Sequence, residues 1–555
     1  MSTDPGQPPP AHPPRRMAVA ALLLSLATLL SRVLGLVREQ VFAALLGAGF
    51  FGDAFATAFR LPNLLRDLFA EGALSAAFQP AFQKTRKTEG LPAAQRLANL
   101  VATLLLCVVG ALVLLGLLFA PQMVDTWATG FSSVEGKAEL TVHLTRIMMP
   151  FLLLVSLAAL AMGMLNAEGR FLPPALAPTL FNLATVVTGL CLWGFGIGAG
   201  RLAATAWAVA TLCGGALQLG LQLFPLYRSG YRFVPAFDFR NARLREVLIT
   251  LLPATVGLMA TQVNLYISTN FASTEQGATA CLYYAFRIVQ LPIGMFGVAV
   301  GTIALQQAAD SASEADLKVA LDGVRQTLRR GLRLVTFYTV PTAVLFYLLA
   351  DPLLALIYER GAFSADDTHR TAVALRHYTV GLAFYAAVKV VVPIFYALKL
   401  ARVAVLATVL TVFVSVVCNV TLHPLFGYRM LALSTSIGAA VNLGFLLVVF
   451  ARRFGGLFPQ QTVLSFLRMA VSGVVMGVFV WFLSPFFWGT RAHIDTGPVF
   501  CKGLGLALLS GLGALVYIGL CKWMRLSEVD DLFGALSRRL PKALSARKST
   551  PPPGQ

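Results

Sequence analysis

The sequence predicts an all-α polytopic membrane protein with about fourteen transmembrane helices. Of its 555 residues, 57% are hydrophobic and only 12% are charged, and a soluble chain of this size could not cover its surface with so few charges. Apolar runs of about 18 residues or more, the length that a helix needs to cross the hydrocarbon core, recur throughout. Alternate loops between these runs are rich in lysine and arginine, as cytoplasmic loops are.

The loops divide by charge. Those after even-numbered spans carry cations such as Lys84, Arg86 and Lys87, whereas those after odd-numbered spans are acidic or mixed. Both termini are therefore expected in the cytoplasm. Topology, and not nucleic-acid binding, then accounts for the net charge of +19. The predicted spans are 19–47, 53–82, 94–120, 140–165, 174–198, 203–226, 245–271, 280–307, 332–350, 370–398, 403–423, 430–451, 464–485 and 499–522.

An internal repeat predicts two six-helix halves around a central cavity. When the chain is aligned with itself at an offset of 227 residues, the separation of Arg60 and Arg287, Ala58-Phe59-Arg60 aligns with Ala285-Phe286-Arg287. Six spans per half is an even number, so both halves would share one orientation, as in many transporters. The expected segments are a disordered cytoplasmic N-terminus (1–18), an N-terminal six-helix half (19–226), a cytoplasmic linker (227–244), a C-terminal six-helix half (245–452), two extra helices (453–523) and a basic cytoplasmic tail (524–555).

Arginines inside membrane-spanning sequence mark the candidate site. An arginine near the bilayer centre costs about 2.5–3.5 kcal/mol on insertion scales, so several of them indicate a function. The alternative for each is snorkelling to the interface, but five separate cases explain the pattern less well than one cavity that binds an anion. The planar guanidinium also binds phosphate oxygens bidentately. The five are Arg32, Arg38, Arg60, Arg66 and Arg287.

The spacing of these arginines predicts interrupted helices. Arg32 and Arg38 are six positions apart, which places them about 120° away from a common helix face. A bend at Gly35 would bring them together. Arg60 and Arg66 have the same spacing, and Pro62 between them is expected to break the hydrogen-bond ladder, as in helices that line a cavity.

Other polar residues in the spans are weaker candidates. Asp53 and Glu71 would supply counter-charges, although Asp53 also suits a helix N-terminus. Lys389 is a further buried cation and a moderate candidate. Amides such as Asn182 are cavity-lining or, more commonly, bonded between helices. The seven cysteines fall singly in predicted spans without ligand spacing, so neither a disulfide framework nor a metal site is expected.

Five stretches carry a resemblance to a known family. They are SRVLGLVREQVFAALLGAGFFGDAFATAFRLPNLLRDLFAEGALSAAFQPAF (31–82), LNAEGRFLPPALAPTLFN (165–182), YYAFRIVQLPIGMFGVAVGTI (283–303), YERGAFSADDT (358–368) and VKVVVPIFYAL (388–398). Together they resemble the MurJ/MviN family of bacterial lipid II flippases, within the multidrug/oligosaccharidyl-lipid/polysaccharide exporter superfamily. The similarity extends over essentially the whole chain.

The resemblance implies a transporter without enzymatic activity or cofactor. It would move lipid II, the undecaprenyl-pyrophosphate-linked disaccharide-pentapeptide, across the bacterial cytoplasmic (inner) membrane by alternating access. Membrane lipids and the peptidoglycan synthesis machinery are the other implied partners. The two extra helices would form a groove for the lipid tail. By motif, the family's substrate-site residues correspond to Arg32, Arg38, Arg66, Arg287, Asp53, Ser31, Asn63 and Glu71.

Departures from the family pattern leave coupling open. Relatives often carry acids beside and shortly after the arginine of the eighth span, where this chain has Phe286 and Gln290. The choice between ion and membrane-potential coupling is therefore unresolved. Two alternatives also stay open: a flippase for another polyprenyl-linked oligosaccharide, and a membrane enzyme acting on lipid-linked sugars. The enzyme would need a catalytic acid on a wet loop, for which Asp366 and Asp367 are the candidates.

Overall fold

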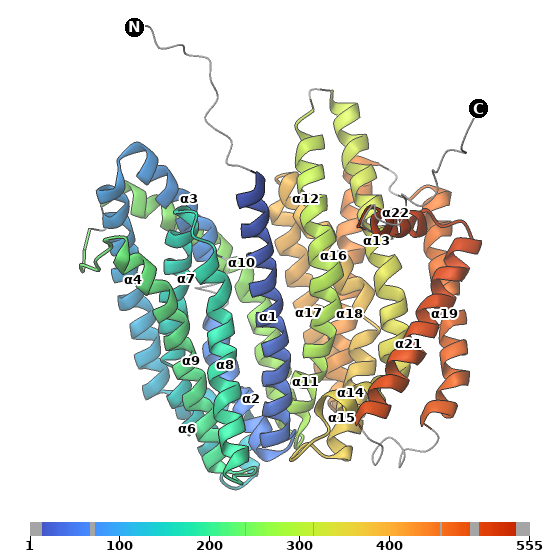
Figure 1. The fold of residues 1–555 in the computed structure, drawn as a ribbon, viewed down its shortest axis with the longest axis horizontal. Coiled ribbons are helices and arrows are strands. Elements are labelled where there is room, and N and C mark those ends of the chain that lie inside the picture. The colour runs from blue at the N-terminus through green and yellow to red at the C-terminus, as the bar shows by residue number, and fades with distance from the viewer. Residues whose placement is uncertain are drawn as a thin grey trace, which may run out of the picture. The chain divides into compact units, whose positions relative to one another are not determined.

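The computed structural model describes residues 14–66, 73–238, 240–314, 316–455, 458–488 and 499–539. Every regular element in these ranges is a helix (Figure 1). The chain divides into two compact units. Unit 1 comprises Met1–Cys281 with Tyr358–Asp367, and unit 2 comprises Leu282–Ile357 with Thr368–Gln555. This division does not test the predicted repeat or its segment boundaries, which stay predictions.

Unit 1 is a bundle in which small residues permit close helix packing. A Cβ on Gly189 of α8 would lie 2.4 Å from Val41 of α1 and 2.6 Å from Trp207 of α9, so only glycine fits between these helices. Its elements are α1 (Pro14–Leu46), α2 (Phe50–Arg66), α3 (Ala73–Thr88), α4 (Leu91–Leu118), α5 (Ala120–Trp127), η2 (Thr129–Ser133), α6 (Lys137–Met148), α7 (Phe151–Ala167), α8 (Leu172–Gly194), α9 (Arg201–Arg228) and α10 (Ala242–Ser273).

Unit 2 contains the remaining helices, and α11 enters it from unit 1. Its elements are α11 (Ala278–Pro292), the π-helical turn η3 (Ile293–Val298), α12 (Ala299–Ala312), α13 (Leu317–Leu348), α14 (Ala350–Tyr358), α15 (Ala365–Thr379), α16 (Leu382–Ala397), α17 (Ala401–Phe426), α18 (Arg429–Phe454), α19 (Gln460–Trp488), α21 (Val499–Trp523) and α22 (Ser527–Arg539). Figure 1 shows α22 lying crosswise to the long helices. It is held by buried Leu526 and Val529 and by an ion pair from Glu528 to Arg333 of α13.

The predicted fourteen spans all fall on helices, but that count is not confirmed. Within the described ranges, ten helices are long and apolar enough to cross a membrane, and an eleventh is reached if α15 and α16, bent by 47°, form one span. The predicted spans 19–47, 53–82 and 245–271 are not among these helices, and each includes residues outside the part of the chain in which spans could be assessed. The second span is divided between α2 and α3, with residues 67–72 outside the described part.

Candidate functional site

The two arginine candidates on α1 differ in their surroundings: Arg38 is held by neighbouring side chains, and Arg32 is exposed. Arg38 donates from Nη1 to Oδ1 of Asn182 on α8, 3.2 Å away, and pairs through Nη2 with Glu39. Its guanidinium also lies 5.4 Å from the ring centroid of Phe181. Arg32 is exposed, and among the described residues it has no hydrogen bond or ion pair. The neighbouring side chains therefore hold Arg38 in position but leave Arg32 accessible.

Asn182 joins α8 to α1 at two points. Besides accepting from Arg38, it donates from Nδ2 to the carbonyl oxygen of Ser31, 3.1 Å away. A Cβ on Gly35 would lie 3.5 Å from the same Nδ2. A side chain at this position would therefore be in ordinary van der Waals contact, and α1 is one continuous helix through Gly35. Half-buried Ser31 takes part through its backbone.

The α2 candidates lie on one unbroken helix, so the predicted interruption at Pro62 is wrong. Pro62 lies inside α2, which ends at Arg66. Since one proline removes only one ladder hydrogen bond, a helix can continue through it where neighbouring helices support it. Arg60 donates from Nη1 to the hydroxyl of Thr269 on α10. Asn63 and Arg66 are half-buried, and Glu71 lies outside the described residues.

Asp53 lies in a fully buried polar cluster within unit 1. Its side chain is 0% exposed, and Oδ2 lies 2.8 Å from Nζ of Lys137, which is 1% exposed. The backbone N–H of Gly277 donates to Oδ2 at 2.6 Å, and that of Ala280 donates to Oδ1 at 2.8 Å. Both donors belong to the start of α11, so Asp53 caps this helix from a distance.

This cluster links three helices through Asp53, and its predicted part in substrate binding stays a prediction. Both carboxylate oxygens are occupied, and the ion pair joins the first turn of α2 to the first residue of α6. Lys137 is also 4.2 Å from the ring centroid of Phe131. The capping alternative weighed for Asp53 was thus close to the observed geometry, but the capped helix is α11 and not α2. Sequence reasoning missed Lys137 because it reads as an outer-loop charge.

The unit 2 candidates lie on α11 and α16. Arg287 is half-buried, donates to the hydroxyl of Tyr283 at 3.1 Å, and lies 5.0 Å from that ring's centroid. It also donates to Oε1 of Gln290 at 3.4 Å, a marginal contact. Lys389 is exposed, so its description as a buried cation is wrong. The backbone of Lys389 is nevertheless closely packed, because a Cβ on Gly301 of α12 would lie 2.2 Å from its carbonyl oxygen.

Arg60 and Arg287 belong to different units. Their equivalence in the repeat, and a central cavity between the two halves, stay predictions.

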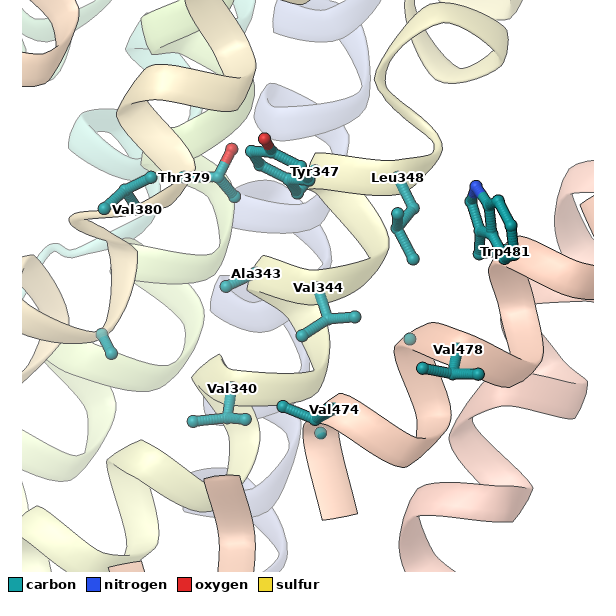
Figure 2. A pocket seen from close by; sticks show the side chains of 13 residues that line it. Val340, Ala343, Val344, Tyr347, Leu348, Thr379, Val380, Val474, Val478 and Trp481 are labelled. Carbon is teal, nitrogen blue, oxygen red and sulfur yellow. The ribbon is translucent and has the colours of Figure 1, made fainter. Parts of the chain in front are cut away.

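An apolar groove lies within unit 2 (Figure 2). It has a volume of about 540 Å³ and is lined by α13, the α15–α16 bend and α19. Figure 2 shows Tyr347, Leu348 and Trp481 toward one end and Val340 and Val474 toward the other. The groove involves the first of the two extra helices, α19, whereas no residue of α21 lines it.

One of the two acids required by the enzyme alternative, Asp367, takes part in a helix cap. Asp366 and Asp367 begin α15. The backbone N–H of Ser364 donates to Oδ2 of Asp367 at 3.0 Å, and the N–H of Asp367 donates back to Oγ of Ser364 at 3.1 Å. This reciprocal pair is a capping box. Among the described residues, no group of three or more His, Cys, Asp and Glu is placed to hold a metal ion.

Comparison with known proteins gives one consistent result. A family model described as "Lipid II flippase MurJ" matches residues 42–495. A probable lipid II flippase MurJ of Rhizobium tropici is 35% identical over 462 residues, covering 82% of this chain and 85% of the relative. The lipid II flippase MurJ of Burkholderia cenocepacia is 34% identical over 486 residues, covering 85% and 92%.

Solved structures share the fold. The lipid II flippase MurJ in an inward closed conformation aligns with a TM-score of 0.75 at 24% identity, covering 92% of this chain and all of that one. An inward-facing multidrug resistance MATE family transporter of the MOP superfamily aligns with a TM-score of 0.62 at 14% identity, covering 79% and 98%. At these identities the likeness concerns the fold alone.

Proposed function

We propose, because the chain belongs to the lipid II flippase MurJ family, that it carries lipid II from the cytoplasmic to the outer leaflet of the bacterial inner membrane. The observation that carries this proposal is the match over residues 42–495 together with relatives aligned over most of their length. The protein is a transporter, and its proposed cargo is the undecaprenyl-pyrophosphate-linked disaccharide-pentapeptide.

The proposed binding residues are the arginines that the family motif assigns. A pyrophosphate loses hydration when it enters a membrane cavity, and this is costly unless new donors replace the water. Arg32 is exposed and Arg66 and Arg287 are half-buried, so each retains surface through which a ligand can be bound. Arg38 is 17% exposed at its side chain and is held against α8, which pre-orients its charge.

The remaining candidates serve as support. Ser31 and Asn63 are half-buried beside the arginines in sequence, and Arg60 is positioned by Thr269. Asp53 acts through the buried cluster that it forms with Lys137. Exposed Lys389 is a further cation on unit 2 available to an anion.

The lipid tail is proposed to occupy the groove along α19. Its lining is almost wholly apolar, and the positions from Val340 to Leu348 on α13 extend over about 12 Å at 1.5 Å per residue. This length accommodates part of a polyprenyl chain while the remainder stays in lipid. We further propose that both termini are cytoplasmic and that alternating access moves the pyrophosphate, with the peptidoglycan synthesis machinery taking up the product.

A depletion experiment tests this function. The chain is expressed in a strain whose own lipid II flippase can be switched off, and lipid II exposed on the outer leaflet is measured by its accessibility to an external probe. We expect the chain to restore exposed lipid II and growth, and the variant with Arg32, Arg66 and Arg287 all changed to alanine to restore neither. Full rescue by that variant, at equal membrane abundance, would disprove the proposed binding residues. Failure of the unaltered, folded chain would disprove the function.

A further inference from the structure

The linker between α9 and α10 forms a strap that lies along α4. The strap comprises residues 231–238 and has no regular secondary structure. The hydroxyl of Tyr231 donates to Oδ1 of Asn99 at 2.7 Å, and the N–H of Ala236 donates to Oγ1 of Thr103 at 3.0 Å. Nδ2 of Asn99 also donates to the carbonyl oxygen of Arg232 at 3.3 Å. Asn99 and Thr103 of α4 thus fix the strap at Tyr231, Arg232 and Ala236.

Further contacts secure both ends of the strap. Arg96 on α4 pairs with Asp238 at 3.3 Å. Arg232 lies with its guanidinium 3.7 Å from the ring centroid of Tyr227 and donates from Nη1 to the carbonyl oxygen of Tyr227 at 2.7 Å. The strap is therefore a built element with a fixed orientation and not a loose connection.

The outward side of the strap is apolar. Three apolar side chains of the strap are exposed: Phe233 (45%), Val234 (58%) and Phe237 (69%). In an ordinary linker, such side chains could turn toward the protein. Phe224 and Tyr227, in the last turn of α9, are also exposed. Five large apolar side chains facing outward in one short region need an apolar or amphipathic neighbour.

The depth of the strap identifies this neighbour as lipid. From Leu97 to Leu118, α4 carries no charged residue, and this stretch is about 33 Å long at 1.5 Å per residue, close to the thickness of a hydrocarbon core of about 30 Å. The strap is bonded to Asn99 and Thr103 near the start of this stretch. Phe237 lies beside Leu104 and Cys107, further along it. A cytosolic protein would not reach this depth, whereas lipid headgroups and upper acyl carbons lie there.

Exposed arginines give the same region a positive charge. Arg228 is exposed, with its guanidinium 4.6 Å from the ring centroid of Phe224, and Arg232, Arg240 and Arg245 are also exposed. Aromatic rings beneath guanidinium groups at the membrane boundary suit a phosphate above and acyl carbons beside them. Each basic residue near the surface contributes about 1 kcal/mol toward an anionic lipid.

We propose that the strap and the last turn of α9 bind an anionic phospholipid of the cytoplasmic leaflet. The phosphate contacts Arg228 and Arg232, and the glycerol and upper acyl carbons contact Phe233 and Phe237. The site belongs to unit 1 alone and does not depend on lipid II transport. Its cytoplasmic position follows from the charge distribution of the loops.

Photo-crosslinking tests the proposal. Phe237 is replaced by p-benzoylphenylalanine, and the full chain is reconstituted in phosphatidylcholine vesicles containing about one-quarter phosphatidylglycerol. We expect lipid adducts in which the ratio of phosphatidylglycerol to phosphatidylcholine is about fivefold higher than in the vesicles, as about 1 kcal/mol of selectivity requires. The double variant Arg228→Gln/Arg232→Gln should keep the adducts but lose the enrichment.

A control crosslinker at a second position and two outcomes that would contradict the proposal complete the experiment. The same photoreactive residue at Phe195, exposed in the loop between α8 and α9 at the other end of these helices, should show no enrichment. Equal enrichment before and after the arginine changes would overturn the proposal. So would adducts at position 237 with another protein instead of lipid when crosslinking is done in cell membranes. Elution and melting temperature of each variant confirm that it is folded.

Discussion

Nζ of Lys137 lies 2.8 Å from Oδ2 of Asp53, and both side chains are almost completely buried. The pair joins α6 to α2, and the same carboxylate accepts the backbone N–H groups of Gly277 and Ala280. A buried ion pair is costly to desolvate and is stable only when further hydrogen bonds satisfy its atoms. Here the start of α11 supplies them.

The first prediction concerns the loss of one partner from this pair. Asp53→Ala leaves an uncompensated lysine charge in the interior, so we expect a loss of about 3–5 kcal/mol in the free energy of unfolding. Lys137→Met leaves the carboxylate with only its two N–H donors and should cost less. The melting temperature in detergent and the amount of folded protein in membranes measure the effect.

The double variant Asp53→Asn/Lys137→Met tests the reason for the loss. It removes both charges but retains an acceptor for the α11 amides, so it should be more stable than Asp53→Ala. If its loss of stability instead equals the sum of the losses of the single variants Asp53→Asn and Lys137→Met, the two residues are not coupled.

The second prediction separates anchoring from binding at Arg38. Asn182→Ala removes one hydrogen-bond partner but leaves the arginine charge and the contact with Glu39. We expect Asn182→Ala to lower transport less than Arg38→Ala, because the charge that binds the pyrophosphate is retained. Arg38→Lys should fall between them, since lysine keeps the charge but loses the planar fork. Outer-leaflet lipid II at equal protein abundance is the readout, and equal defects in Asn182→Ala and Arg38→Ala would assign Arg38 to anchoring alone.

Sequence reasoning predicted the helical architecture well because apolar length is a strong signal. The predicted spans fall on helices wherever the structure describes them. It was less successful with geometry. Pro62 was expected to break α2, but tertiary packing maintains the helix. Lys389 is exposed and not buried, because an apolar run does not show which face of its helix packs against neighbours.

The candidate site shows the same limit. Composition and spacing select the arginines, because a charge in an apolar run is conspicuous. They do not show that Arg38 contacts Asn182, which lies 144 residues away. They also gave no indication of Lys137, since no local pattern links a loop lysine to an aspartate 84 residues earlier. Partners at such separations are set by helix packing, and one sequence does not encode them in a readable pattern.

The third prediction concerns the loop at residues 358–364, which packs on the α1–α2 turn within unit 1. Gly361 has φ +59, and a Cβ there would lie 2.3 Å from the carbonyl oxygen of Ala44. That oxygen accepts the N–H of Ala362 at 2.8 Å. Gly361→Ala should therefore displace the loop and lower both the melting temperature and transport. The control is Gly136→Ala, which has φ +74 but nothing within 4 Å of its Cβ, so it should cost only the conformational penalty of about 1–2 kcal/mol. Equal losses from the two variants would show that the contact with Ala44 is unimportant.

The fourth prediction concerns the apolar groove of unit 2. Gly477 lines it from α19, and a Cβ there would lie 3.0 Å from Val344 on the opposite wall. Gly477→Leu should fill part of the groove and exclude a polyprenyl chain, so exposed lipid II should decrease severalfold in the depletion strain. Gly511→Leu on α21 is the matched control, because its Cβ would meet nothing within 4 Å and it does not line the groove. The control should transport normally.

The melting temperature of the variant and the length of the polyprenyl chain distinguish a blocked groove from a misfolded protein. Both glycines are helical, so either leucine should improve intrinsic helix propensity by about 0.5–1 kcal/mol, and a melting temperature of Gly477→Leu near that of the control would exclude unfolding as the cause. A shortened polyprenyl analogue should then be transported by Gly477→Leu better than the full-length lipid, because less chain needs the groove. Equal defects for both lipids, in a folded protein, would place the tail elsewhere and leave the groove without a part in transport.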